Sequence, residues 1–245
     1  MKKNPNTGAE QQDFSSASGD FSNISSDNSY LPLFIDFSEK PVLIFGGGAV
    51  GERKVERFIH APLQVVSLKF TEKISEYAKA GRIQVLEKDV SEISDADLKK
   101  MMDGVFLVIV ATPDEQQNNR IEQMAKSAGI LVNHTGGAEE VIIPSLIDRN
   151  GLQIAISSGG ESPAVTKYAR LQIEKAIGSD FEKMIEIQND VRNLLKNRVP
   201  DQKKRQEILW EIMDSGDIWD LLKSENASDF EKAKEKAFMM AGIQK

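Results

Sequence analysis

The sequence predicts an α/β fold in which a parallel sheet with crossover helices is followed by a region made of helices alone. Two observations predict it. Between Pro41 and Asn133, short apolar runs typical of buried strands alternate with segments of helical periodicity. From Pro163 to Lys245 the spacing is helical. With 245 residues, 40% of them hydrophobic, the chain is long enough for one large domain and a smaller one.

The first unit of the alternation is a strand, a tight turn and a helix. Val42–Phe45 is apolar, three glycines follow, and Glu52–Ile59 has helical spacing. Further strands are expected at Leu63–Leu68, Ile83–Leu86, Val105–Ala111 and Ile130–Asn133, and further helices at Glu72–Ala80 and Glu115–Ala128. This alternation predicts a parallel sheet, because each parallel pair of strands needs a crossover connection.

The remaining segments are a tail and a second structured region. Residues 1–30 are rich in Ser, Asn, Asp and Gly, a composition that cannot offset the entropy of ordering, and predict a disordered tail. A strand is expected at Leu152–Ser157, followed by a Ser-Gly turn. The next helix is expected to open near Ser162 and Pro163, because proline suits the first helical turn.

Composition excludes several classes of function. There is no cysteine, so disulfides, thiolate metal sites and cysteine nucleophiles are excluded. The net charge of -7 gives no general attraction to nucleic acid. No apolar run approaches the ~20 residues of a membrane-spanning helix, and the N-terminus lacks the apolar core of a signal peptide. We therefore expect a cytoplasmic protein that binds neither nucleic acid nor membrane.

Gly46, Gly48 and Gly51 form a G-x-G-x-x-G pattern directly after the first strand and before the first helix. Gly46 permits the tight turn, Gly48 lets the backbone approach a pyrophosphate, and Gly51 allows close packing of helix on strand. The helix N-terminus adds free N–H groups for an anion. With Gly47 inside the turn, the pattern predicts a Rossmann domain that binds a dinucleotide; a glycine-rich turn without a ligand is the alternative.

The form of the dinucleotide stays open. An acidic residue for the ribose hydroxyls usually lies ~20 residues further on, where this chain reads Val66-Ser67-Leu68-Lys69. Lys69 either contacts the 2′-phosphate of NADP or is a solvent-exposed loop residue without a ligand. We therefore expect NAD as the cofactor and do not exclude NADP. Thr112 and Pro113 follow the next long strand, where a Rossmann fold places its second cofactor-contacting turn. An ordinary strand-helix turn is the alternative there.

Several segments together resemble one family. They are LPLF at Leu31–Phe34, VLIFGGGAVGERK at Val42–Lys54, FLVIVAT at Phe106–Thr112, IPSLIDR at Ile143–Arg149 and IAISSGGESP at Ile154–Pro163, with Asn118, Arg170, Arg205 and Trp210. In this order and spacing they resemble the precorrin-2 dehydrogenase and sirohydrochlorin ferrochelatase family, which forms the N-terminal module of siroheme synthase.

The resemblance implies a homodimeric enzyme that oxidises precorrin-2 to sirohydrochlorin with NAD. It divides the chain into a tail (1–30), a Rossmann domain (31–142), a dimerisation and substrate region (143–178) and a helical domain (179–245). It also implies a set of nucleotide contacts, with Ala49 and Val50 at the glycine turn and Leu68 and Lys69 beside the adenosine ribose. Ser158 matches a serine that is phosphorylated in a fused member and lies in the tetrapyrrole site.

One stretch departs from the family pattern. Where the family commonly has Asn-Val-Val-Asp, with the Asp credited in catalysis, this chain has Asn133-His134-Thr135-Gly136-Gly137. His134 is then the best-placed base, because an imidazole titrates near neutrality and the end of a strand faces the crevice. A polar loop residue is the alternative. Since metal insertion needs a base for the pyrrole protons, the missing carboxylate predicts weak or absent chelatase activity.

A polycarboxylate substrate favours arginine and lysine in the site. Arg149, Lys167 and Arg170 flank the matched segments, with surface charges as the alternative. The Ser-Ser-Gly-Gly turn before a helix can hold a carboxylate on its N–H groups, or serve only to cap the helix. The predicted site therefore comprises His134 and Ser158 as catalytic residues, Ser157, Gly159, Arg149 and Arg170 as substrate-binding residues, and no metal.

Two other functions stay open. A dehydrogenase that is also a ferrochelatase would use the same site. A non-enzymatic nucleotide-sensing module would need the Rossmann domain alone. The IAISSGGESP turn and its following helix favour an enzyme, because a plain sensor does not need them.

Overall fold

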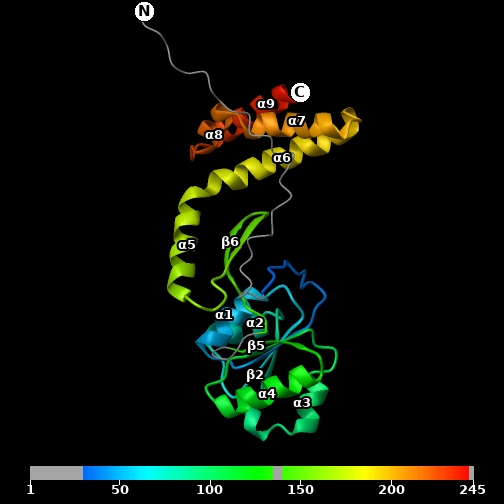
Figure 1. Cartoon of the computed structure of the whole chain (residues 1–245), viewed down its shortest axis with the longest axis vertical. Coiled ribbons are helices and arrows are strands. Elements are labelled where there is room, and N and C mark those ends of the chain that lie inside the picture. The colour runs from blue at the N-terminus through cyan, green and yellow to red at the C-terminus, as the bar shows by residue number, and fades with distance from the viewer. Residues whose placement is uncertain (1–29, 135–139, 243–245) are drawn as a thin grey trace, which may run out of the picture. The chain divides into compact units, whose positions relative to one another are not determined.

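The computed structural model describes residues 30–134 and 140–242. In this part of the chain the larger sheet has five parallel strands in the order β3-β2-β1-β4-β5, and the predicted α/β fold is confirmed. The strands are β1 (Val42–Phe45), β2 (Leu63–Ser67), β3 (Gln84–Glu87), β4 (Leu107–Val110) and β5 (Leu131–His134) (Figure 1). The predicted tail lies outside the described residues, apart from its last residue, Tyr30.

The strand order reverses between β1 and β4. The chain places β2 and β3 on one side of β1 and then returns to place β4 and β5 on the other side. In register, Phe45 of β1 lies beside Val66 of β2 and Val110 of β4. The carboxyl ends of β1 and β4 therefore adjoin, and this reversal is where open α/β sheets bind their ligands.

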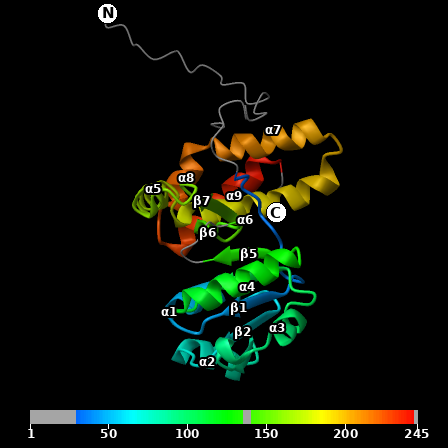
Figure 2. The same ribbon diagram turned by 60° about the horizontal axis from the view of Figure 1, so that its bottom comes forward.

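Helices cover both faces of this sheet. They are α1 (Ala49–Arg57), α2 (Glu72–Lys79), α3 (Asp95–Met101) and α4 (Glu115–Ser127), with a short 3-10 helix η3 (Val90–Glu92) before α3. Val55 of α1 and Ile74 of α2 belong to the core on one face, whereas Leu98 of α3 and Ile121 of α4 belong to the core on the other. Figure 2 shows α4 beside β5. All residues of β1 and β4 are buried, which explains their continuous apolar sequences.

A separate antiparallel hairpin follows, formed by β6 (Ser145–Arg149) and β7 (Leu152–Ile156). Its turn consists of Asn150 and Gly151, which have φ of 45° and 119°, the positive values that tight two-residue hairpin turns need. Helix α5 (Pro163–Ala176) packs against this hairpin and opens where the sequence predicts. The Ser162 side chain caps it by accepting a hydrogen bond from the N–H of Val165 at 3.3 Å.

The described residues beyond α5 form helices α6 (Ser179–Arg198), α7 (Gln202–Met213), α8 (Gly216–Leu222) and α9 (Ala227–Met240). They enclose a core of their own, to which α6 contributes Met184, Ile187, Val191 and Leu195 at helical spacing. No helix within the described ranges combines the length and the apolarity needed to cross a membrane.

Within the described residues, the sequence did not predict the short helix η3, and it missed two longer elements. One is α3, which begins at a reciprocal cap: the Ser94 hydroxyl donates to the Asp97 carboxylate at 2.8 Å and accepts from the Asp97 N–H at 3.2 Å. The other is β6, which pairs with β7 in the hairpin. Predicted and observed bounds otherwise differ by a few residues; α1 begins at Ala49 rather than Glu52.

Candidate active site

The turn between β1 and α1 leaves no room for a Cβ at three positions, Gly46, Gly47 and Gly51. Gly46 has a φ of +117°, and a Cβ on it would lie 2.4 Å from the carbonyl oxygen of Ala111. A Cβ on Gly51 would lie 1.9 Å from the carbonyl oxygen of Gly46. No side chain can be accommodated at these distances, so α1 approaches the end of β1 more closely than any other residue types would allow.

The loop after β2 lies against the same turn. The carbonyl oxygen of Gly47 accepts a hydrogen bond from the N–H of Thr71 at 3.0 Å. A Cβ on Gly47 would lie 2.3 Å from the carbonyl oxygen of Lys69. Leu68 and Lys69 are both exposed. These two residues therefore lie at the surface beside the glycine turn, and the end of β2 carries a cation rather than a carboxylate.

Gly48 is the open position of the turn. No atom lies within 4 Å of the place where its Cβ would be, and it precedes α1 as the N-cap residue without a side-chain cap. The first N–H groups of a helix, here beginning with those of Ala49 and Val50, have no acceptor inside the helix. The space in front of α1 therefore suits an anionic group that approaches the backbone closely.

Thr112 and Pro113 form the turn between β4 and α4. The Thr112 hydroxyl donates to Asn118 Oδ1 at 2.5 Å, and Asn118 Nδ2 donates to the carbonyl oxygen of Thr112 at 3.0 Å. Asp114 caps α4 by accepting from two N–H groups of its first turn. Asn118 is only 3% exposed, so the turn is fixed to α4 by a buried amide.

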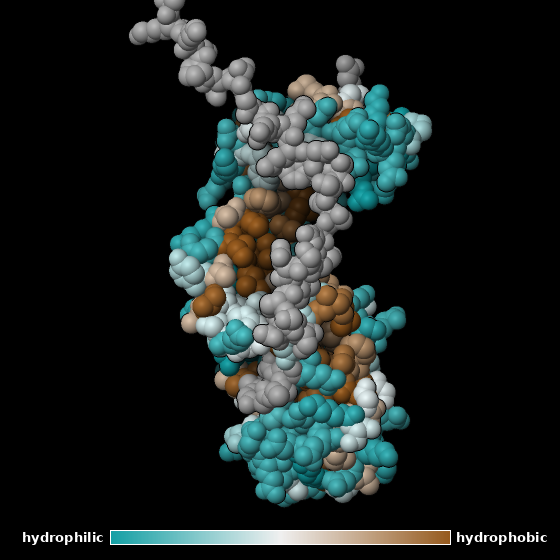
Figure 3. Space-filling model, in the orientation of Figure 1, coloured by the Kyte–Doolittle hydropathy of each residue, from teal (hydrophilic) through white to brown (hydrophobic). Residues whose placement is uncertain are grey.

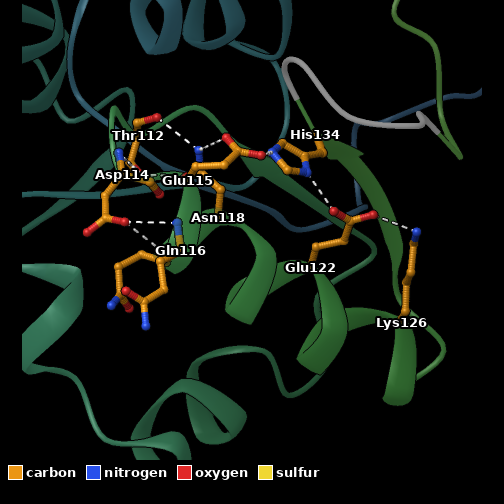
Figure 4. A network of polar contacts seen from close by, with 9 residues as sticks. Thr112, Asp114, Glu115, Gln116, Asn118, Glu122, Lys126 and His134 are labelled. Carbon is orange, nitrogen blue, oxygen red and sulfur yellow. Dashed lines mark hydrogen bonds and ion pairs between the residues drawn. The ribbon is translucent and has the colours of Figure 1, made fainter.

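His134 ends β5, and its imidazole is enclosed rather than facing an open crevice (Figure 4). Its side chain is 2% exposed, with Nδ1 2.5 Å from Glu122 Oε2 and Nε2 3.5 Å from Glu115 Oε1, both on α4. Nε2 is buried and has no hydrogen-bond partner in the described part of the chain. The expectation that this ring faces the crevice therefore differs from the structure, because the ring packs between β5 and α4.

The neighbours of Glu122 favour its ionised form. Its carboxylate accepts a hydrogen bond from Lys126 Nζ at 2.5 Å and contacts His134 on its other oxygen. The hydrogen bond from Lys126 is the largest influence, with a further one from His134, and together they outweigh the effect of burial and lower the pKa of Glu122. Residues Thr135–Glu139, with the Gly136-Gly137 pair of the departing stretch, lie outside the described residues.

A pocket of about 580 Å³ lies beside α5. Its walls come from the end of α1, the segment around β6, the end of β7 and the first turns of α5. The lining residues are Arg57, Ile142, Ile143, Pro144, Ser145, Ile156, Ser157, Ser158, Gly160, Pro163, Thr166, Lys167 and Arg170. Of the predicted site, the pocket thus brings together Ser157, Ser158 and Arg170, whereas Gly159 is not among its lining residues.

Three cationic side chains are among the lining residues. Lys167 and Arg170 come from α5, and Arg57 comes from the last turn of α1. Arg170 Nη1 is 2.5 Å from Glu174 Oε1. Arg57 is not predicted from the sequence, because nothing near it indicates that the end of α1 meets the pocket. Together the three side chains make the pocket suitable for a ligand with several carboxylates.

Arg149 lies elsewhere. Its Nε donates to the carbonyl oxygen of Ile177 at 3.1 Å, and its Nη1 donates to its neighbour Asp148. It does not line the pocket. The prediction that Arg149 binds substrate is therefore not supported by its position, since its guanidinium instead holds β6 to the end of α5.

The serine turn supports the start of α5. Ser158 Oγ accepts hydrogen bonds from the N–H of Ser162 at 2.9 Å and from the hydroxyl of Thr166 at 3.1 Å. The N–H of Gly159 donates to Ser157 Oγ at 3.0 Å. Both serine side chains thus act in the turn itself while lining the pocket. Within the described ranges, no group of three or more His, Asp or Glu side chains is placed to hold a metal ion.

Comparison with known proteins gives matches along most of the chain. Residues 33–145 match a family model described as "Putative NAD(P)-binding", and residues 149–176 match one described as "Sirohaem biosynthesis protein central". Precorrin-2 dehydrogenase of Methanosarcina barkeri is 39% identical over 212 residues, which are 86% of this chain and 93% of that relative.

Two further matches are informative. Siroheme synthase 1 of Klebsiella pneumoniae is 34% identical over 206 residues, 83% of this chain but 42% of that relative. The solved structure of the precorrin-2 dehydrogenase SirC superposes with a TM-score of 0.69 at 23% identity, covering 86% of this chain and 100% of that chain. The fold and the glycine turn define an α/β protein of the NAD(P)-binding class. The chain belongs to the precorrin-2 dehydrogenase family.

Proposed function

We propose that the protein is a precorrin-2 dehydrogenase that oxidises precorrin-2 to sirohydrochlorin with NAD⁺. The observation that carries the proposal is the match to the Methanosarcina barkeri enzyme over 93% of that relative's length. The reaction removes a hydride and a proton from the substrate, giving NADH and H⁺. Anaerobic formation of NADH on mixing the protein, precorrin-2 and NAD⁺ tests it, and no NADH above a protein-free blank contradicts it.

The glycine turn supports the nucleotide part of the proposal. The space over Gly48 and the first N–H groups of α1, at Ala49 and Val50, suit the pyrophosphate. Leu68 and Lys69 lie on the side expected for the adenosine ribose, and Thr112 and Pro113 follow the adjoining strand. When bound, NAD⁺ supplies the hydride acceptor. The residues of this chain hold NAD⁺ at the carboxyl edge of the sheet.

The pocket beside α5 supports the substrate part. Precorrin-2 is a macrocycle edged with carboxylates, and Arg57, Lys167 and Arg170 offer charge-assisted hydrogen bonds to them. The N–H groups of the serine turn, which includes Ser157 and Ser158, are further donors for a carboxylate. Holding the macrocycle in one orientation against the nicotinamide is the largest contribution that such a site makes to hydride transfer.

The homodimer is part of the proposal, and α5 supports it. This helix has no fully buried residue, and Val165, Tyr168 and Leu171 are 61%, 66% and 40% exposed on one of its faces. Figure 3 shows hydrophobic surface in the region of α5 and the β6-β7 hairpin. An apolar face of this kind on a helix needs a partner, and a second copy of the chain is the partner that the family resemblance implies. A cytoplasmic location stays a prediction of the sequence.

A further inference from the structure

The imidazole of His134 lies between two carboxylates of one helix. Glu122 and Glu115 are seven positions apart on α4, and they approach the ring at Nδ1 and Nε2. The ring is 2% exposed at its side chain, and its Nε2 is buried. A general base must reach the proton it removes directly or through one water. The enclosure of both nitrogens by α4 therefore favours a structural task for this ring over proton transfer from the substrate.

A polar path leads from this ring to the turn after β4 (Figure 4). Glu115, which contacts His134 Nε2, is also 3.5 Å from Asn118 Nδ2 through its other oxygen. The same Nδ2 donates to the carbonyl oxygen of Thr112 at 3.0 Å, and Asn118 Oδ1 accepts from the Thr112 hydroxyl. The end of β5 is thus linked through the first turn of α4 to Thr112 and Pro113.

The second nitrogen anchors the ring. Nδ1 contacts Glu122, which Lys126 also holds from the following turn of α4. The ring is therefore held at one nitrogen by a part-buried hydrogen bond with Glu122 and turns the other nitrogen toward Glu115, which is itself 65% exposed. An exposed side chain has many conformations open to it, and the contacts that oppose this freedom at Glu115 are the buried ring at one oxygen and Asn118 Nδ2 at the other.

We propose that His134 is a positioning residue for the nucleotide: through Glu115 and Asn118 it sets the Thr112-Pro113 turn against the bound dinucleotide. This inference rests on the proposed function, because it takes that turn as part of the NAD site. It predicts that loss of the Nε2 contact weakens NAD⁺ binding while the hydride-transfer step itself keeps its rate.

Two amide variants separate the two nitrogens. The Asn amide of His134→Asn lies near the position of Nδ1 and offers a donor to Glu122, whereas the longer amide of His134→Gln reaches the position of Nε2 and offers a donor to Glu115. Calorimetric NAD⁺ titrations and steady-state kinetics are compared with those of the wild type. We expect His134→Asn to raise the Kd for NAD⁺ about fivefold to tenfold, His134→Gln to stay within about twofold, and kcat to change less than about twofold in both.

Glu115→Ala tests the contact between His134 and Glu115 from its other side. Because Glu115 is 65% exposed, we expect this variant to fold. It should raise the Kd for NAD⁺ as His134→Asn does, and the double variant should be no worse than either single one, because both remove one contact. Asn119→Ala, an exposed position on the same helix, is the matched control and should bind as the wild type does.

The outcomes separate the inference from the function on which it rests. A wild-type protein that binds no NAD⁺ contradicts the proposed function. A wild type that binds NAD⁺, with His134→Asn and Glu115→Ala binding equally well, overturns the positioning role. A large fall in kcat at unchanged NAD⁺ affinity in both His134 variants also overturns it and returns the ring to proton transfer. Thermal unfolding of each variant shows whether a loss of affinity reflects loss of the folded state.

Discussion

The Cβ that Gly51 lacks would lie 1.9 Å from the carbonyl oxygen of Gly46, so the start of α1 and the end of β1 are in direct backbone contact. Gly51→Ala must push them apart, and we expect a loss of about 1–3 kcal/mol in the free energy of unfolding. Gly48→Ser is the matched control, since its Cβ meets no atom within 4 Å and serine is a good N-cap residue. Urea unfolding of both variants checks this, and an Ala variant as stable as the Ser variant contradicts the contact.

The pocket cations provide a second prediction. Arg57→Ala and Arg170→Ala should each raise the KM for precorrin-2 about tenfold and leave NAD⁺ affinity unchanged, because each removes a charge-assisted hydrogen bond to a substrate carboxylate. Arg149→Ala is the control, since its guanidinium is turned to the carbonyl oxygen of Ile177. Steady-state kinetics measure the KM of each variant. If Arg149→Ala raises the KM as much as Arg57→Ala does, Arg149 binds substrate as the sequence predicts, and the pocket beside α5 is not the substrate site.

Acid should lower the free energy of unfolding through Glu122, which contacts Lys126 and His134. The pKa of Glu122 is lowered in the folded state, first by the hydrogen bond from Lys126, so its ionisation stabilises the fold above its ordinary value of 4.5. That stability is lost as pH falls through the lower folded-state pKa. Glu122→Gln should be about 1 kcal/mol less stable than the wild type near neutrality, and the difference should narrow below pH 4.5. Urea titrations across this range measure it, and a difference that does not change with pH counts against the ionised carboxylate.

The exposed face of α5 predicts the assembly. Light scattering should give the mass of a dimer at micromolar concentration, and Tyr168→Glu should give a monomer, because it places a charge in an apolar interface. Met239→Glu is the matched control: its side chain is similarly exposed, at 64%, and lies on α9. A wild-type protein that is a stable monomer, or a Met239 variant that dissociates equally, contradicts an interface on α5.

Much of the sheet could be predicted because its strands report their burial directly. Val42–Phe45 is apolar at every position, and the structure buries every one of them. The β6-β7 hairpin also has a signal in the sequence. Asn150-Gly151 is the strongest short signal for a two-residue turn, and it lies between β6 and β7. The Ser94-x-x-Asp97 pattern likewise indicates the start of α3.

The site was less predictable because side-chain directions depend on contacts between distant elements. The position of His134 at the end of a strand is apparent from the sequence, but its burial is set by Glu115 and Glu122, which the pattern does not connect with it. In the same way Arg57 lines the pocket and Arg149 does not, although Arg149 is the one in a recognisable segment. Backbone roles at glycines follow from local sterics, whereas roles of long cationic side chains do not.

The most direct measurement is an anaerobic reaction of precorrin-2 with NAD⁺, in which sirohydrochlorin and NADH are followed together by absorbance. The wild type should form sirohydrochlorin and NADH in equal amounts. Gly48→Asp should remain folded, because its Cβ lies in open space, and should form neither, because its carboxylate repels the pyrophosphate in front of α1. A wild type that leaves precorrin-2 unoxidised, or a Gly48→Asp variant that oxidises it at the wild-type rate, would contradict an NAD-dependent dehydrogenase built on this glycine turn.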